Sequence, residues 1–287
     1  MLSASTLKLL RIPFSAFLSP LYFFALVQVP HIHWGNALLI FIILHLLIYP
    51  ASNGYNSYMD RDTGSIGGLE KPPLPERQLF YVTIILDAAG FLLGFLISPL
   101  FAALILIYIA ASKAYSYRGI RLKQYPVTGY LVVIIFQGAL TFGMVYYGSN
   151  ADGTLYMPWQ GLVICTLLIG GFYPLTQIYQ HEQDVADGVA TISYRLGYTG
   201  TFVFCAVVYL LAAVFMAQFF IMQQEGDKLL LVSIFFIPVI VYFTKWFLQV
   251  RQNSQAANFK NTMYMNWLAA TCTNLSFITL LIWKRLE

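Results

Sequence analysis

Long apolar stretches recur along the chain and are separated by short polar segments. About 20 mostly apolar residues in an α-helix are needed to cross the hydrocarbon core of a bilayer. Nine stretches meet this requirement and predict transmembrane helices at residues 12–29, 36–54, 79–97, 99–116, 126–147, 159–178, 200–222, 229–249 and 264–283. We therefore expect an all-α integral membrane protein in which residues 1–287 form a single transmembrane domain.

Composition strengthens this assignment. The chain is 59% hydrophobic and only 10% charged, whereas about 25% of the residues of a soluble domain are charged. The net charge of +4 is small, and the basic residues lie in short stretches. Nucleic-acid binding needs a continuous basic face or stripe. We therefore expect the lipid bilayer, and no nucleic acid, among the partners of this chain.

The basic residues also predict the orientation in the membrane. Thirteen of the 16 lie in the N-terminal segment and in the loops that follow even-numbered helices: Lys8, Arg11, Arg61, Lys71, Arg77, Lys113, Arg118, Arg121, Lys123, Arg195, Lys245, Arg251 and Lys260. Short basic loops stay in the cytoplasm. The pattern predicts a multi-pass protein of the cell (inner or plasma) membrane, with a cytoplasmic N-terminus and the even-numbered loops facing the cytoplasm.

Two polar segments at this face hold seven of the 12 acidic residues. The first follows the second predicted helix. If that helix continues, Asn53, Asn56 and Asp60 fall at positions i, i+3 and i+7 and share one face. Asp62 lies nearly half a turn off that face unless the helix has already ended.

The second acidic segment follows the sixth predicted helix. In a helix, Gln180, Asp184 and Asp187 share one face, and Gln177, His181 and Asp184 share another. Two acidic clusters at one membrane face indicate a hard cation. Mg²⁺ takes oxygen ligands and commonly bridges one or two carboxylates to a substrate phosphate.

A basic and aromatic loop, residues 113–123, lies at the same face. Arginine binds phosphate oxygens in pairs and lysine acts as a point charge, so this loop suits a diphosphate. Each segment also has a plainer interpretation. Loop charges commonly serve as solvated topology anchors, an Asn or Asp at a helix end often caps it, and acidic clusters can pair with basic loops. The coincidence of three such segments at one face favours a lipid diphosphate site.

The motifs occur in a recognisable order. Arg11 with Pro13 precedes the first helix, residues 56–60 are followed by Lys71-Pro72, residues 115–123 form a Tyr-Ser…Leu-Lys loop, and residues 182–197 form a second acidic motif. Together they resemble the UbiA superfamily of intramembrane prenyltransferases over the whole chain. The 115–123 loop is most similar to chlorophyll-synthase-like members.

Some positions depart from the family pattern. In the first motif Gly64 stands where a further Asp is usual, and Lys71 replaces Arg. In the second motif Gln180 stands where the leading Asp is expected. Asp62 and Asp187 are additional acids that offer compensation.

The resemblance implies a helical bundle with a central, lipid-accessible cavity capped by cytoplasmic loops, and Mg²⁺ as cofactor. The implied metal ligands are Asn56, Asp60, Asp62, Asp184 and Asp187. The implied diphosphate-binding residues are Arg11, Lys113, Arg118, Arg121 and Lys123. The implied catalytic residues are Asp60, Asp184, Lys123 and Tyr115, supported by Asn53, Gln180, Glu182 and Lys71.

The expected activity is Mg²⁺-dependent transfer of a prenyl group from a prenyl diphosphate to a hydrophobic acceptor, aromatic or polycyclic. A terpene cyclase of the same fold, in which the allylic cation is captured internally, is the alternative. A transporter is a remote third hypothesis. It predicts polar residues spread through broken mid-membrane helices, whereas here they concentrate at one face.

Overall fold

The computed structural model describes residues 2–287 as helices joined by loops. In chain order the elements are α1 (Ala4–Leu9), η1 (Ile12–Phe17), α2 (Ser19–Gln28), α3 (Trp34–Ile42), η2 (Ile43–Ile48), α4 (Tyr49–Asp60), α5 (Arg77–Gly94), α6 (Pro99–Ser116), η3 (Leu122–Gln124), α7 (Pro126–Val133), η4 (Ile134–Leu140), α8 (Thr141–Ser149), α9 (Trp159–Gln177), α10 (His181–Ala186), α11 (Ile192–Met222), α12 (Gly226–Gln252), η5 (Ser254–Ala256) and α13 (Phe259–Leu286). Elements η1, η3 and η5 are 3₁₀-helical, and η2 and η4 are π-helical.

Membrane-spanning helices account for most of the chain. Within residues 2–287, eight helices are long and apolar enough to cross a membrane, and residues 4–28 give a ninth span if their two helices, bent by 41°, are counted together. The last eight predicted spans are thus confirmed, and three differences from the prediction stand out. The first span is broken rather than continuous, α4 extends past residue 54 to Asp60, and α11 begins at Ile192 because it continues through a break at Gly197 (φ 67°).

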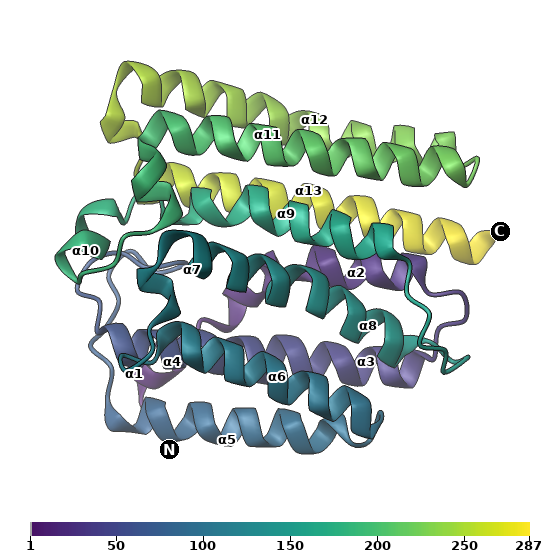
Figure 1. Ribbon diagram of the computed structural model, residues 1–287, viewed down its shortest axis with the longest axis horizontal. Coiled ribbons are helices and arrows are strands. Elements are labelled where there is room, and N and C mark those ends of the chain that lie inside the picture. Colours follow the sequence, from purple (N-terminus) through teal and green to yellow (C-terminus); the bar gives the residue numbers. More distant parts are fainter. Residues whose placement is uncertain (1) are drawn as a thin grey trace.

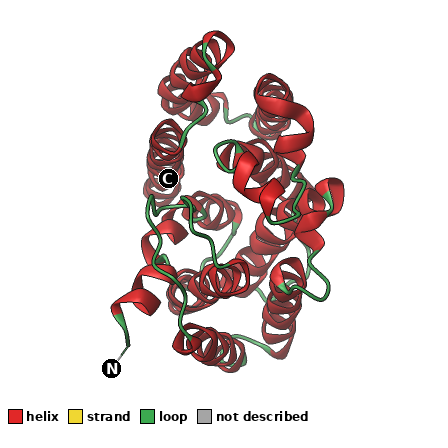
Figure 2. Ribbon diagram, turned by 90° about the vertical axis from the view of Figure 1, so that its left-hand side faces the viewer, coloured by secondary structure: helices red, strands yellow, loops and turns green. Residues whose placement is uncertain are grey.

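The long helices run side by side in one bundle (Figure 1). The N-terminus, α10 and the loop after α4 lie at one end, whereas the C-terminus lies at the other. Figure 2 looks onto the first of these ends, with the helices seen along their axes. The acidic and basic segments of the sequence therefore meet at one end of the bundle, as expected for loops after even-numbered helices. The side of the membrane that this end faces stays a prediction.

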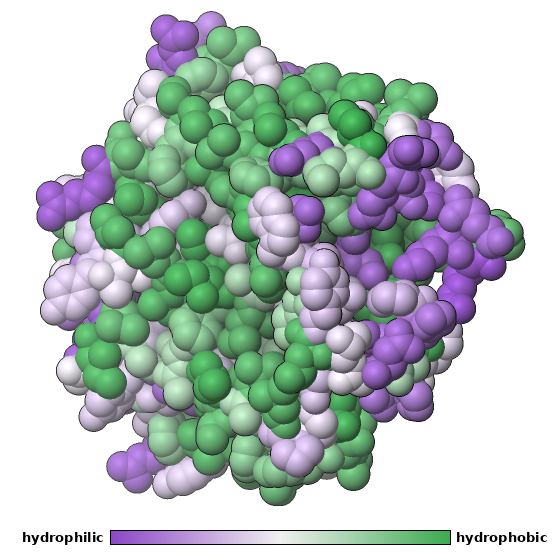
Figure 3. Space-filling view, turned by 45° about the vertical axis from the view of Figure 1, so that its right-hand side comes forward, coloured by the Kyte–Doolittle hydropathy of each residue, from purple (hydrophilic) through white to green (hydrophobic). Residues whose placement is uncertain are grey.

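The outer surface of the bundle is apolar. Hydrophobic atoms cover most of the face shown in Figure 3, and large side chains such as Leu210 and Val241 are more than half exposed. Inside, Phe24, Phe142 and Phe277 are fully buried in the main core. A surface of this kind is stable only against lipid, which makes the chain a multi-pass membrane protein.

One buried ion pair joins three helices close to the acidic segments. Lys113 Nζ of α6 lies 2.6 Å from Asp87 Oδ2 of α5, and 4.0 Å from the ring centre of Tyr55 in α4. Asp87 is only 7% exposed. The acid within the third span is therefore paired with Lys113, and the pair holds α5 and α6 against α4. In this structure the Lys113 side chain contacts Asp87 and Tyr55. Its role in diphosphate binding stays a prediction.

We expect Lys113→Met to lower the free energy of unfolding by about 2 kcal/mol, because it leaves the Asp87 carboxylate without its cation. Chemical denaturation of the detergent-solubilised protein, followed by circular dichroism, measures this change. The double variant Asp87→Leu/Lys113→Met should recover most of the loss, since it removes both charges. Equal stability of wild type and Lys113→Met would contradict a structural role for the pair.

Candidate active site

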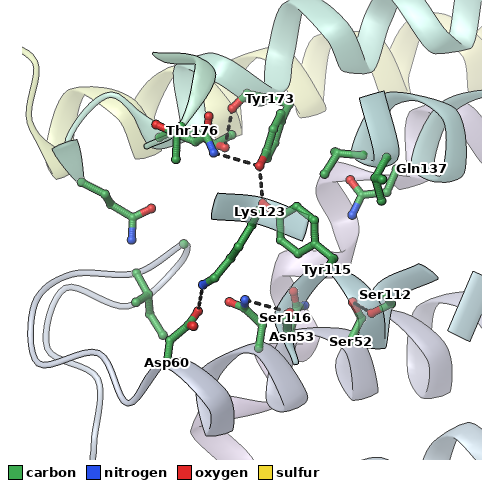
Figure 4. Close-up of a pocket in the computed structure, with 18 of the residues that line it drawn as sticks. Ser52, Asn53, Asp60, Ser112, Tyr115, Ser116, Lys123, Gln137, Tyr173 and Thr176 are labelled. Carbon is green, nitrogen blue, oxygen red and sulfur yellow. Dashed lines mark hydrogen bonds and ion pairs between the residues drawn. The ribbon is translucent and has the colours of Figure 1, made fainter. Parts of the chain in front are cut away.

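A cavity of about 200 Å³ lies at the end of the bundle that carries the acidic segments (Figure 4). Its walls come from η1, α4, α6, η3, α7, η4, α9, α10 and the adjoining loops. It gathers nine of the predicted site residues: Arg11, Asn53, Asn56, Asp60, Asp62, Tyr115, Lys123, Gln180 and Asp184. The structure therefore brings carboxylates, amides and cations from four distant parts of the sequence into one space.

Asp60 is the last residue of α4. Its carboxylate pairs with the ammonium group of Lys123 from η3, an interaction drawn in Figure 4, and lies 3.8 Å from the guanidinium of Arg121. The Asp60 and Lys123 side chains are both largely buried. Because α4 continues to residue 60, Asn53, Asn56 and Asp60 share the face that the sequence predicted, and all three line the cavity.

The end of α4 brings Asp62 into the same cavity. Arg61 has a left-handed backbone (φ 55°) and terminates the helix, so Asp62 is not confined to the helical spacing. Its carboxylate accepts a hydrogen bond from Gln183 Nε2 at 2.6 Å. A Cβ at Gly64 would lie 2.4 Å from Gln183 Oε1. The glycine found where the family usually has Asp thus leaves room for the side chain that holds Asp62.

The second acidic segment is divided in two, not one continuous helix. Helix α9 ends at Gln177, and α10 begins at His181. Gln180 lies between them, and its Nε2 donates to the carbonyl of Ser65 at 3.0 Å. Asp184 of α10 faces the cavity. The amides of Gln180 and Gln183 therefore connect the two acidic segments to each other directly.

His181 holds α10 in place from the other side. Its Nε2 lies 2.8 Å from Ser193 Oγ, and its ring stacks on Tyr198 at 4.9 Å between centroids. Both partners belong to α11 on either side of the break at Gly197. Burial lowers the pKa of His181 to about 4, so the ring is neutral at pH 7. This contact fixes the position of Asp184 relative to the bundle.

Asp62, in the loop after α4, and Asp184, in α10, share an unfavourable electrostatic environment. Burial, with the charge of Asp60, raises the pKa of Asp62 to about 6. Burial also raises the pKa of Asp184 to about 7, with added repulsion from Asp62 and Asp60, although Lys123 opposes this. Carboxylates that repel one another in this way lie close together. Asp60, Asp62 and Asp184 accordingly line the same cavity.

Arg118 and Arg121 act beside the cavity. Arg118 donates to the backbone carbonyls of Met59 at 2.7 Å and Asp60 at 3.3 Å. These carbonyls lie at the end of α4, where the helix itself supplies no hydrogen-bond donor. Arg121 donates to the carbonyl of Asp187 at 2.8 Å and pairs with its carboxylate. The two arginines therefore fasten the end of α4 to the chain that follows α10.

Six predicted site residues do not line the cavity: Lys71, Lys113, Arg118, Arg121, Glu182 and Asp187. Lys71 and Glu182 are exposed. Asp187 is occupied by the two arginines, at 3.4 Å from Arg118. The roles predicted for these side chains in metal or diphosphate binding stay predictions.

Arg11 closes another side of the cavity. It is 9% exposed and donates to the carbonyls of Asn53 at 3.1 Å and Gly67 at 3.2 Å. Among the described residues 2–287, its Nε has no hydrogen-bond partner. The guanidinium is thus held by backbone contacts and retains a donor in the region of Asp60 and Asp62.

The interior of the cavity contains polar groups that the sequence analysis did not select. Ser52 and Ser112 hydrogen-bond at 2.6 Å, and Gln137 projects from the π-helical η4 and is a hydrogen-bond partner of Tyr108. A glutamine within an otherwise apolar span was the available signal for Gln137. π-Helical turns are frequent at functional sites because they redirect side chains.

A second cavity of about 130 Å³ continues from the first one. The two share wall residues, among them Tyr108 and Tyr173, but the second is lined largely by apolar side chains such as Phe17, Ile169 and Phe172. The polar end of the site therefore leads into an apolar, aromatic space between the helices.

The oxygen donors suit a hard divalent cation. Within residues 2–287, no group of three His, Cys, Asp or Glu side chains is arranged to hold a metal ion. Asp60 Oδ1 is buried without a hydrogen-bond partner in the described part of the chain, and Asp62 and Asp184 line the same cavity. Mg²⁺ typically binds one or two carboxylates and completes its shell with water and substrate phosphate, which matches this incomplete donor set.

A model of the UbiA prenyltransferase family matches residues 16–269. The chain belongs to the UbiA prenyltransferase family. The sequence resemblance is thereby confirmed, and so is the membrane-embedded helical bundle. A search among curated proteins found no match to the chain.

Solved structures share this UbiA fold over nearly the whole chain. A UbiA homologue from Archaeoglobus fulgidus, bound to DMAPP and Mg²⁺, is 18% identical with a TM-score of 0.68, covering 97% of this chain and 99% of that one. An apo UbiA homologue from Aeropyrum pernix K1 is 16% identical with a TM-score of 0.68, covering 93% and 98%. A digeranylgeranylglyceryl phosphate synthase structure is 16% identical with a TM-score of 0.63, covering 97% and 98%.

The raised pKa of Asp184 predicts a pH-dependent stability. When the pKa of an acid is higher in the folded state than in the unfolded state, the group stabilises the fold at pH values below its unfolded-state pKa. That contribution is lost as the pH rises through the folded-state pKa. We expect wild type to lose stability relative to Asp184→Asn as pH rises from about 4 to about 7. The thermal-unfolding midpoints of both proteins, measured in detergent without metal, give this difference.

The comparison with Asp184→Asn is needed because His181, with its lowered pKa, shifts stability in the opposite direction. Both proteins share that histidine, so it cancels in the difference. Added MgCl₂ should reduce this loss of stability at the higher pH in wild type only, because Asp184→Asn lacks the carboxylate. A difference that does not vary with pH would contradict the buried, repelled state of Asp184.

Proposed function

We propose that this UbiA-family protein transfers a prenyl group from a Mg²⁺-bound prenyl diphosphate to a hydrophobic, aromatic or polycyclic acceptor. The observation that carries the proposal is the convergence of Asp60, Asp62 and Asp184 on one cavity that also contains Arg11 and Lys123. Carboxylates and cations in the same small space suit a ligand that brings both phosphate and metal. The adjoining apolar cavity suits the isoprenoid tail.

The metal, when bound, would neutralise charge on the diphosphate and so favour its departure. Asp60, Asp62 and Asp184, with Asn53 and Asn56, are the residues that would hold it. UbiA homologues from Archaeoglobus fulgidus bound to Mg²⁺ with DMAPP or with GPP support this assignment.

The chain's own cations contribute the second part of the chemistry. Arg11 and Lys123 lie in the cavity wall and can take up the negative charge that develops on the leaving diphosphate. Lys123 is bonded to Asp60 in this structure. If a metal ion bound to the substrate diphosphate coordinates the Asp60 carboxylate, the Lys123 ammonium group is released from that ion pair. It can then bind phosphate oxygens within the same cavity.

Aromatic side chains line the path of the prenyl group. Tyr115 and Tyr173 line the cavity and hydrogen-bond to each other through their hydroxyl groups (Figure 4), and Phe14 is also part of the wall. Their faces can stabilise an allylic cation, and the enclosed space limits quenching by water. The basic loops at this end of the bundle support a site that faces the cytoplasmic side of the cell membrane.

We expect Asp60→Asn and Asp184→Asn each to reduce diphosphate release from geranyl diphosphate by roughly 100-fold or more, because each removes a carboxylate from the metal site. Released diphosphate is measured with purified protein, MgCl₂ and a membrane lipid extract as acceptor. Asp227→Asn is the matched control, since that acid lies at the start of α12, at the other end of the bundle. Unchanged release in both site variants would reject the proposal.

The same assay distinguishes transfer from cyclisation. Without an acceptor, a cyclase releases diphosphate at the full rate and yields a cyclic hydrocarbon. We expect diphosphate release to depend on the acceptor and the prenyl group to appear in an acceptor lipid.

A further inference from the structure

Helix α12 lies at the edge of the bundle, where it packs against α11 and α13 (Figure 1). Its outer face points away from the rest of the protein, and large side chains on this face are exposed, Ile237 at 56% and Val241 at 62%. A shallow groove runs along the same face, formed by residues 240–252. It lies in the half of α12 that ends beside the acidic segments.

The groove has an apolar part and a polar part. Ile240 and Val241 line it toward the middle of the helix. Lys245, Gln249 and Gln252 follow toward the helix end at positions i, i+4 and i+7, so they share one face. These three side chains are exposed and form no hydrogen bond or ion pair within the described part of the chain. The polar part therefore offers one cation and two amides to a ligand.

The position of the groove along α12 places it at the boundary of the hydrocarbon core. Lys228 lies at the other end of the bundle, where it pairs with Glu225 and Glu287. The stretch of helix from Lys228 to Lys245 is about 25 Å long, slightly less than the roughly 30 Å hydrocarbon core of a bilayer. The flexible Lys245 side chain can thus carry its ammonium group to the level of the lipid phosphates. The apolar part of the groove lies about one turn deeper, among acyl chains.

The charge around the groove indicates which lipid headgroup fits. Residues 228–286 contain no Asp or Glu. Lys245, Arg251 and Lys260 are exposed at this corner of the bundle, and none of them forms an ion pair within the described part of the chain. By contrast, Lys123 at the same end of the bundle is paired with a carboxylate. A cationic corner without acids is complementary to an anionic headgroup, and anionic lipids are abundant in the cytoplasmic leaflet, the side predicted for this end.

A second copy of this chain is the other candidate for this face. Two copies in one membrane have the same orientation, so a two-fold contact through the groove would place the two Lys245 side chains at the same depth. Neither α12 nor α13 supplies a carboxylate at this end to separate them. Repulsion between like charges is strong near a low-dielectric interior. The charge distribution therefore favours a lipid over a second copy.

We propose that the groove on α12 is a binding site for an anionic phospholipid. Its phosphate accepts hydrogen bonds from Lys245 Nζ and Gln249 Nε2, and one acyl chain lies along Ile240 and Val241. The site is on the outer surface of the bundle, separate from the cavity between α4, α6 and α9. A lipid bound there does not compete with a substrate in that cavity.

A fluorescent label one turn below the groove reports which lipid occupies it. Ile237→Cys is made in a Cys272→Ser background, since the other two cysteines are buried. The protein is labelled with bimane and reconstituted in bilayers of phosphatidylcholine with phosphatidylglycerol, one of which is brominated on its acyl chains. From the quenching we expect phosphatidylglycerol to be enriched about fivefold over phosphatidylcholine at this position.

Ile85→Cys in α5 is the matched control. Ile85 is 64% exposed and lies as many residues from Arg77 as Ile237 lies from Lys245. Arg77 follows Glu76 directly, so its charge is compensated and we expect no enrichment there. Adding Lys245→Gln to the Ile237→Cys protein should remove most of the enrichment. Equal enrichment at both labelled positions would make Lys245 an ordinary topology anchor and overturn the site.

Two other outcomes would also overturn the proposal. Equal quenching by the two brominated lipids at position 237 would mean that the groove takes bulk lipid without preference. Efficient disulfide cross-linking of a Leu248→Cys variant in membranes would mean that a second copy covers this face. We expect the thermal-unfolding midpoint of Lys245→Gln to match that of wild type, because the side chain is exposed and unpaired in the described structure. A loss of enrichment is then a loss of lipid binding and not of the fold, and no measurement in this series depends on turnover.

Discussion

The balance of charge around Asp60 determines much of the arrangement of this site. A carboxylate at a helix end inside a lipid-embedded bundle is stable only beside cations, because desolvation of an isolated charge is expensive. Lys123 and Arg121 supply these cations from the loop after α6. Arg121 also binds Asp187, so the same electrostatic contact ties the end of α4 to the segment after α10. The acidic and basic segments are thus positioned by the ion pairs between them.

This balance also explains why the carboxylates remain reactive toward a cation. The cations do not fully compensate the acids: Asp62 and Asp184 keep raised pKa values, and no residue from 2 to 287 forms a hydrogen bond with Asp60 Oδ1. A divalent ion would relieve this repulsion more effectively than a proton, because it interacts with several oxygens at once. The protein therefore folds with its negative charges held together and incompletely neutralised, which is the condition that a metal-bridged diphosphate requires.

The spans and the polar segments could be predicted from the sequence because long apolar runs and charged loops are properties of composition. The shared face of Asn53, Asn56 and Asp60 followed from helical spacing. The turn at Arg61 could not be predicted, because a non-glycine residue with positive φ is uncommon. Nor could the pairing of Lys113 with Asp87, which depends on how α5 and α6 pack.

The departures from the family pattern have a common physical consequence. Gly64 and Gln180 stand where the sequence resemblance leads us to expect acids. Gln180 and Gln183 each donate a hydrogen bond from the second acidic segment to the first. Burial and, to a smaller extent, repulsion already raise the pKa of Asp184, and neutral amides can make these contacts without adding to the repulsion. Further carboxylates in this small space would raise that pKa more and favour protonation over metal binding. Fewer acids, cross-linked by amides, therefore form a site that stays assembled before substrate arrives, and the three carboxylates that remain face the cavity itself.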